Sequence, residues 1–175
     1  MDNFTIVGQK IPKIDAPVKA TGDALYIQDI KVSGMLHGKI LYSKYPHARI
    51  LKLDTSKAQT LPGVRAVVTA ADMPPNFRIG VMKDNPPLKS GKTKSIRDEI
   101  AAVAAISTEI AEEALSLIEV EYEELPGIFD PIEAMQEGAT LIHEEVKSNI
   151  LKMPWKLVCG DVETAKKDSA HIVED

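Results

Sequence analysis

The sequence predicts an α/β (α+β) fold in which a mixed β-sheet is flanked by helices. The prediction rests on the stretch from Glu99 to Pro126, where the hydrophobic period changes twice. Ile100–Ile106 is almost wholly apolar, as in a strand that is buried on both faces. Apolar residues then recur at helical spacing, and from Ile118 onward they alternate with glutamates, as in a strand with one solvent-exposed face.

The helix between these two strands is predicted to begin near Glu109, with Thr108 as its N-cap, because a threonine hydroxyl can accept from the free amides of the first turn. Pro126-Gly127 is expected to end the second strand. If the two strands were parallel neighbours, the helix between them would make a right-handed crossover. The many glutamates here indicate a solvated face rather than paired carboxylates for acid–base catalysis.

The N-terminal half is predicted to begin with an extended arm, residues 1–23, because its prolines disfavour helix in the residues before them. Ala24–Ile27 is expected to be a short strand. Met35–Lys44 and Ala48–Asp54 alternate in polarity and are separated by a short turn at Pro46, so they predict a hairpin.

The next segments predict a short helix, a turn, a strand and a long loop. Ser56 and Gln59 have the spacing of a capping box and predict a helix that ends at Gln59 or Thr60. A turn at Pro62-Gly63 precedes a β-branched strand, Val64–Thr69, and then a single helical turn at 70–73. Residues 76–95 show little periodicity and are predicted to be a long exposed loop, for which disorder or ordering by a partner is favoured over a functional site.

After the central stretch, Asp130-Pro131 with Glu133 predicts a helix start. A short helix is expected over 162–167. Residues 170–174 resemble the start of a strand that has no evident pairing partner, so the chain is expected to be a piece that stops inside a further domain.

Composition restricts the class of protein. The chain has 175 residues, of which 44% are hydrophobic and 27% charged, and these are ordinary values for a globular domain. Its net charge of −5 argues against a nucleic-acid or anionic-membrane surface. The single cysteine, Cys159, excludes an intrachain disulfide, and the N-terminus lacks the apolar core of an export signal, so we expect a cytoplasmic protein.

The sequence predicts no catalytic, cofactor-binding or metal-binding residue. The four histidines, His37, His47, His143 and His171, show no metal-ligand spacing with one another or with Cys159. His47 follows a proline in a turn, so a surface or hydrogen-bonded role is expected. Cys159 is interpreted as an unreactive thiol. Glycine-rich phosphate loops and nucleophile elbows are also absent from the sequence.

Several stretches together resemble the N-terminal domain of the large, molybdopterin-binding subunit of the molybdenum hydroxylases, the group of xanthine dehydrogenase, aldehyde oxidase and carbon monoxide dehydrogenase. The resemblance lies in the order and spacing of the whole set. The matching segments are Pro12–Ile30, Met35–Pro74, Ile100–Met135, Leu141–Glu145, Asn149-Ile150 and Gly160–Ala165.

The resemblance implies an α/β hammerhead domain over 24–140, followed at 141–175 by a linker and the start of a truncated molybdenum-cofactor-binding domain. In that family the cofactor loops and the catalytic glutamate lie beyond the hammerhead. The chain would therefore bind no cofactor and be inactive alone. Its partners would be the molybdenum-cofactor-binding domains and the iron–sulfur subunit of a complete oxidoreductase.

The chain departs from the family pattern at two places. Arg97-Asp98-Glu99 stands where a glycine, an acidic residue and proline or alanine are usual, and Tyr42 and Lys44 stand where arginine and proline are frequent. An alternative hypothesis therefore remains open: an independent binding or scaffold protein that reuses the hammerhead fold without redox chemistry.

Overall fold

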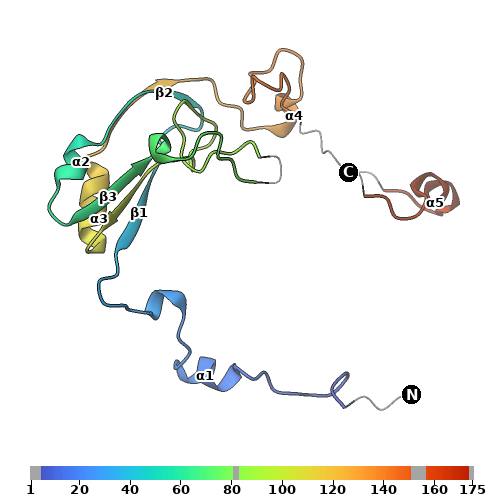
Figure 1. Cartoon of the computed structure of the whole chain (residues 1–175). Helices are drawn as coiled ribbons and strands as arrows, with labels where there is room; N and C mark the ends of the chain where they lie inside the picture. The colour runs from blue at the N-terminus through green and yellow to red at the C-terminus, as the bar shows by residue number, and fades with distance from the viewer. Residues whose placement is uncertain (1–4, 81–82, 151–156, 174–175) are drawn as a thin grey trace.

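The computed structural model describes residues 5–80, 83–150 and 157–173. Within them the strands form two three-stranded antiparallel sheets (Figure 1). Sheet A has the order β1 (His37–Tyr42), β5 (Glu99–Ala105), β3 (Val64–Thr69), and sheet B has the order β4 (Lys92–Thr93), β2 (Ala48–Asp54), β6 (Glu119–Glu124). The α/β fold class is confirmed, although the strands divide between two antiparallel sheets and do not form one mixed sheet.

This division overturns two predicted pairings. The predicted β1–β2 hairpin is wrong, because β1 pairs with β5 and β2 pairs with β6. The two strands of the central stretch, β5 and β6, are not neighbours either, so the helix between them connects two sheets. The charge pattern favours this arrangement, since basic residues of β2 meet the glutamates of β6 at Arg49–Glu123 (2.7 Å) and Lys52–Glu121 (3.6 Å).

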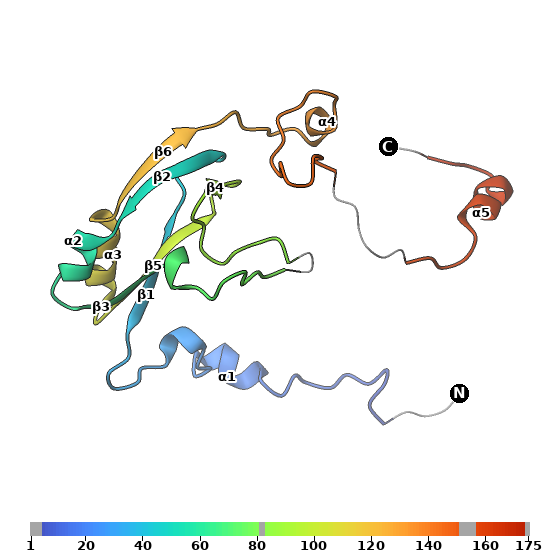
Figure 2. The same ribbon diagram turned by 45° about the horizontal axis from the view of Figure 1, so that its top comes forward.

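The main core lies between one face of sheet A and two helices, α2 (Ser56–Thr60) and α3 (Thr108–Ser116), which Figure 2 shows beside the sheet. Small side chains dominate the contact, and they allow the helix backbone to approach the sheet closely. The buried residues of this core are Ala58, Ala101, Val103, Ala105, Ala111, Ala114 and Ile118.

The start of α3 differs from the predicted one by one residue, whereas the N-cap of α2 is one of the residues expected there. The N-cap of α3 is Ser107, whose Oγ accepts from the amide of Ile110 at 3.3 Å, and that of α2 is Thr55. The predicted turn at Pro62-Gly63 is confirmed, and it requires glycine. Gly63 has φ +95°, and a Cβ there would lie 2.8 Å from Cδ1 of Ile110.

A second buried cluster lies where β1 ends and β2, β4 and β5 begin. Ser43 Oγ donates to Thr93 Oγ1 at 3.3 Å, and Thr93 Oγ1 donates to the carbonyl of Ala48 at 3.3 Å. His47 is only 2% exposed, and its Nδ1–H donates to the carbonyl of Pro126 at 2.6 Å. The expected hydrogen-bonded role of His47 is therefore confirmed, whereas a surface position is wrong.

The two ends of the chain lie away from the sheets (Figures 1 and 2). The arm is not wholly extended, because it contains α1 (Ala16–Thr21), and the strand expected at Ala24–Ile27 is replaced by the 3-10 turn η1 (Ile27–Asp29). Asp130 caps α4 (Pro131–Ala134) and Asp161 caps α5 (Val162–Asp168), both near the expected positions. Residues 170–173 are not a strand, and 174 lies outside the described residues. No described helix is long and apolar enough to cross a bilayer.

We predict that Ala111→Leu will destabilise the domain by about 1–3 kcal/mol, because the larger side chain must displace β5 or adopt a strained rotamer. Ala111 is fully buried against the sheet, whereas Glu113 of the same helix is exposed. The control Glu113→Leu is expected to change stability by less than about 0.5 kcal/mol. Urea unfolding followed by circular dichroism gives both values, and equal effects would contradict the packing described here.

Candidate functional site

A polar cleft of about 710 Å³ lies between the segment 78–98 and the later segment 143–145. Its walls are mostly charged. The residues that line it are Arg78, Gly80, Asp84, Asn85, Pro86, Lys89, Ser90, Gly91, Lys92, Lys94, Asp98, His143 and Glu145.

Lys89 is a buried lysine in the wall of this cleft, with only 6% of its side chain exposed. Its ammonium donates to the carbonyl of Pro86 at 2.8 Å and to Glu99 Oε2 at 3.4 Å, and Asp98 Oδ1 lies 3.8 Å away. A buried ammonium requires such partners, because burial removes the hydration that stabilises its charge. Lys89 therefore ties the segment before β4 to the start of β5.

Lys92 and Lys94 hold the segment 141–145 against β4. Lys92 Nζ contacts Glu144 at 2.7 Å, and Lys94 Nζ contacts His143 Nδ1 at 2.9 Å and Glu145 at 3.2 Å. A hydrogen bond from its own backbone amide, together with Lys94 and His143, lowers the pKa of Glu145 to about 2. Hydrogen bonding to Lys92 also lowers the pKa of Glu144. Both carboxylates are therefore charged near neutral pH.

Asp98 organises the turn that leads into β5. Its Oδ2 accepts from the backbone amides of Lys94 at 2.6 Å and Ser95 at 3.3 Å. The side-chain carboxylate thus accepts hydrogen bonds from backbone amides that would otherwise lack an acceptor in a tight turn. Asp98 of the Arg97-Asp98-Glu99 turn therefore forms part of the wall of the cleft.

The charges of the cleft are arranged for holding chain segments together. Each of its three lysines already contacts at least one carboxylate within 4 Å. A flat organic cofactor prefers apolar or aromatic walls, and this lining is mostly polar and contains no Phe, Tyr or Trp, so the cleft is a poor fit for a pterin. The arrangement is suited to binding between polypeptide segments.

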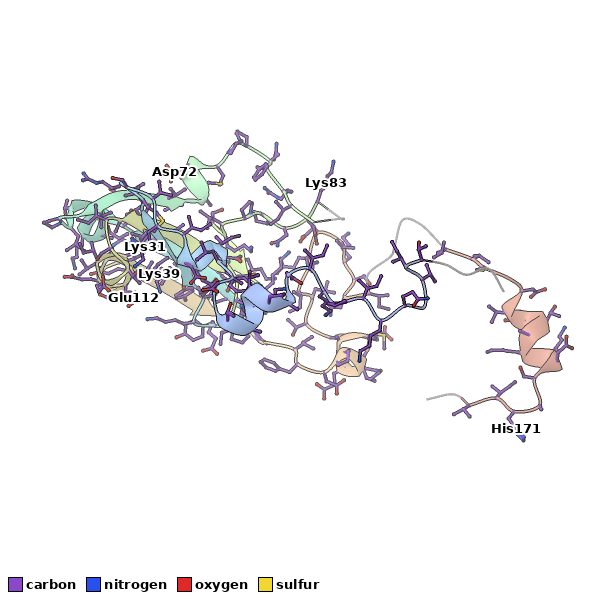
Figure 3. The ribbon with its side chains drawn as sticks, turned by 90° about the horizontal axis from the view of Figure 1, so that it is seen from below. Lys31, Lys39, Asp72, Lys83, Glu112 and His171 are labelled. Carbon is purple, nitrogen blue, oxygen red and sulfur yellow. The ribbon has the colours of Figure 1, made fainter. Side chains whose placement is uncertain are left out.

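The structure places the other candidate residues apart from one another. His37 Nδ1 lies 3.2 Å from Thr108 Oγ1, beside α3, while His171 lies beyond α5 (Figure 3). Cys159 is exposed. Within residues 5–80, 83–150 and 157–173, no group of three or more His, Cys, Asp or Glu residues could hold a metal ion. That this chain has no catalytic, cofactor or metal residue stays a prediction.

Sequence reasoning missed the cleft because it treated 76–95 as an exposed loop. That prediction is wrong at Leu88, Lys89 and Thr93, which are buried, and at β4. The available signal was weak. Leu88 is one of several apolar residues in this segment, and Thr93 lies between two lysines, as in a strand with one buried face.

We predict that Lys89→Met will destabilise the domain by about 3 kcal/mol, because it leaves the Asp98 and Glu99 carboxylates without their cation. The double variant Lys89→Met/Asp98→Asn should regain part of this loss. Lys92→Met is the control, since its partner Glu144 is 65% exposed and such pairs contribute about 1 kcal/mol or less. Urea unfolding measures all three, and equal losses for the two lysines would contradict the buried role of Lys89.

Glu145 should make stability depend on pH in the acid range. Its pKa of about 2 lies below the usual value of 4.5, so its stabilising contribution is present above about pH 4.5 and is lost as the pH falls toward 2. Glu145→Gln should therefore flatten the decline of the melting temperature in this window. Melting temperatures measured across the window test this, and identical profiles for wild type and Glu145→Gln would contradict it.

Comparisons with known proteins agree with this fold. Residues 21–126 match the family model described as aldehyde oxidase and xanthine dehydrogenase, a/b hammerhead domain. A probable xanthine dehydrogenase subunit from Bacillus subtilis is 43% identical over 92% of this chain and 21% of its own length. The nicotinate dehydrogenase large molybdopterin subunit of Eubacterium barkeri is 37% identical over 99% of this chain and 40% of its own length.

Solved structures extend the agreement to three dimensions. Carbon monoxide dehydrogenase from Oligotropha carboxidovorans superposes with a TM-score of 0.73 and 38% identity, over 80% of this chain and 18% of that one. The aldehyde oxidoreductase of Desulfovibrio gigas gives 0.70 and 34%, over 75% and 16%. This chain thus spans two fifths or less of the length of each of these proteins. The match of the family model over residues 21–126, which include every strand of sheets A and B, shows that the chain belongs to the aldehyde oxidase and xanthine dehydrogenase family, through its α/β hammerhead domain.

Proposed function

We propose that this chain is the non-catalytic hammerhead portion of a molybdenum hydroxylase and serves a structural, subunit-packing role. In the complete enzyme it would pack against the molybdenum-cofactor-binding domains and help to seat the iron–sulfur subunit. The complete enzyme would hydroxylate an aldehyde or a nitrogen heterocycle, with water as the oxygen source. Alone, the chain would be inactive.

The observation that carries this proposal is the apolar surface of the two ends of the chain. In the segment that precedes β1, Ile14 is fully exposed, Ile27 is 89% exposed and Leu25 is 79% exposed. Near the other end, Phe129 is 82% exposed and Leu157 is 87% exposed. Isolated apolar residues on a surface are ordinary, but a succession of them on segments that leave the core is typical of an interaction surface.

The polar cleft supports the same role. Its lysines and carboxylates fix the path of 141–145 against β4, and so determine where the following polypeptide leaves the domain. The molybdopterin cofactor would supply oxygen transfer and accept electrons in the complete enzyme. The residues of this chain would contribute only by placing the neighbouring domains. The free thiol of Cys159 supports our further proposal of a cytoplasmic setting.

A transplantation experiment tests the proposal. The purified chain is expected to contain no molybdenum by elemental analysis and to show no oxidoreductase activity. A chimera in which this chain replaces the matching segment of the Bacillus subtilis relative is expected to fold and to retain molybdenum. Stoichiometric molybdenum in the isolated chain would contradict the non-catalytic role. A folded chimera without molybdenum would favour the independent scaffold instead.

Ile27→Asp in the chimera is expected to lower molybdenum content and assembly severalfold, because it places a charge in an apolar contact. The isolated chain should unfold at the same temperature with or without it, since Ile27 is exposed there. Lys31→Asp, in the same exposed segment before β1 (Figure 3), is the matched control and should assemble normally. Equal assembly of the two variants would show that the apolar residues of this segment do not form an interface.

A further inference from the structure

Sheet A has an uncovered face that is wholly apolar. Its other face is covered by α2 and α3, and there Leu41, Val67 and Val103 pack into the main core (Figure 2). The pairing of β5 with both of its neighbours is regular over Ala101–Ala104, so residues that alternate with the core residues point away from the helices. These residues form the open face of sheet A: Gly38, Ile40, Ala66, Val68, Ala102 and Ala104.

The open face is continuous across all three strands. Two rows cross the sheet, and they are Ile40–Ala102–Val68 and Gly38–Ala104–Ala66. Ala102 and Ala104 are partly exposed although they lie on the central strand, whereas Ala101 and Ala105 on the helix-covered side are fully buried. The described part of the chain therefore leaves the open face without a cover.

Sheet B shows how this chain builds a sheet face that meets water. Exposed ion pairs join β2 and β6 there, Arg49 with Glu123 at 2.7 Å and Lys52 with Glu121 at 3.6 Å. A solvated face of an antiparallel sheet normally carries polar side chains of this kind. The open face of sheet A carries only glycine, alanine, valine and isoleucine, so it is suited to burial against another element.

The helix-covered face of β5 indicates which kind of element fits. There Ala111 and Ala114 of α3 pack into one buried core with Ala101 and Ala105 of β5. The opposite face of the same strand repeats the pattern with two alanines two residues apart. Small side chains along a central strand let a helix backbone approach closely. Two strand spacings also span about 10 Å, which is about the diameter of a helix.

The described helices other than α2 and α3 do not supply this cover. Neither α1, α4 nor α5 contains a buried residue, so none of them packs into a core. Each relative compared above, by contrast, has at least three fifths of its length outside the part that this chain matches. That additional length is the source of a covering helix.

We propose that the open face of sheet A binds an amphipathic helix with a stripe of alanine or other small residues, supplied by the part of the complete protein that lies outside this chain. The helix lies along β5, opposite α3, and makes sheet A the middle of three layers. This inference rests on the proposed function, and it names the surface through which the hammerhead packs on a neighbouring domain.

Thiol labelling of the chimera tests the proposal, in a Cys159→Ser background that removes the exposed natural thiol of this chain. Ala66→Cys places a thiol on the open face, and the control Glu121→Cys places one on the charged face of sheet B; both positions are exposed. Both should react with a maleimide in the isolated chain. In the chimera, labelling at residue 66 should slow by about tenfold or more, because the cover must open first, while labelling at residue 121 stays constant.

Peptide mass spectrometry reads the labelling at each site, and circular dichroism confirms that each variant is folded. A benzophenone maleimide on the residue 66 thiol then identifies the cover. Crosslinks are expected outside the matched segment, at residues three or four apart. Unchanged labelling at residue 66 in a folded chimera, equal protection at residue 121, or crosslinks to residues 5–36 or to a second copy would each overturn the proposal.

The molybdenum content of the unlabelled chimera separates this inference from the proposed function. Protection at residue 66 in a chimera without molybdenum would support a covered open face and contradict the proposed function. A chimera that retains molybdenum but labels freely at residue 66 would overturn this inference alone.

Discussion

The close contact between α3 and β5 is the interaction on which the rest of the domain depends. Ala111 and Ala114 of the helix and Ala101 and Ala105 of the strand are fully buried against one another. Because these side chains are so small, the helix lies close to the sheet. α3 then delivers Ile118 into the same core before the chain enters β6, so the position of sheet B follows from the way the helix packs on sheet A.

The second buried cluster joins the sheets by polar contacts. Ser43, Thr93 and the carbonyl of Ala48 form a short hydrogen-bonded chain between the end of β1 and the two strands of sheet B. His47, the residue before Ala48, donates from Nδ1 to the carbonyl of Pro126, and its Nε2 has no partner among the described residues. Buried polar groups with specific partners favour a single arrangement of neighbouring elements more than a purely apolar contact would. The cleft around Lys89 extends this polar region to the surface.

Local periodicity predicted most helices and strands correctly, because the signals are contained within a few residues. The apolar run before α3 correctly indicated a central strand, and Asp130 correctly indicated the start of α4. Local periodicity did not predict which strands pair with each other. Whether β1 pairs with β2 or with β5 depends on packing between segments far apart in the sequence, and the short turn at Pro46 favoured the wrong neighbour. The cleft was missed because lysine is rarely buried, and the carboxylates that allow it at Lys89 lie nine and ten residues away.

The interleaving of the two sheets has a consequence for synthesis. Sheet A uses residues 37–105 and sheet B uses residues 48–124, so each sheet is interrupted by strands of the other. As the chain leaves the ribosome, β1 stays unpaired until β5 has been synthesised. β2 is not paired over its full length until β6 has been synthesised. Neither sheet can be completed before the other has begun, so the nascent chain carries unpaired strands until almost the whole domain has emerged. The pairing of both sheets therefore depends on residues 99–124, the last part of the two sheets to emerge.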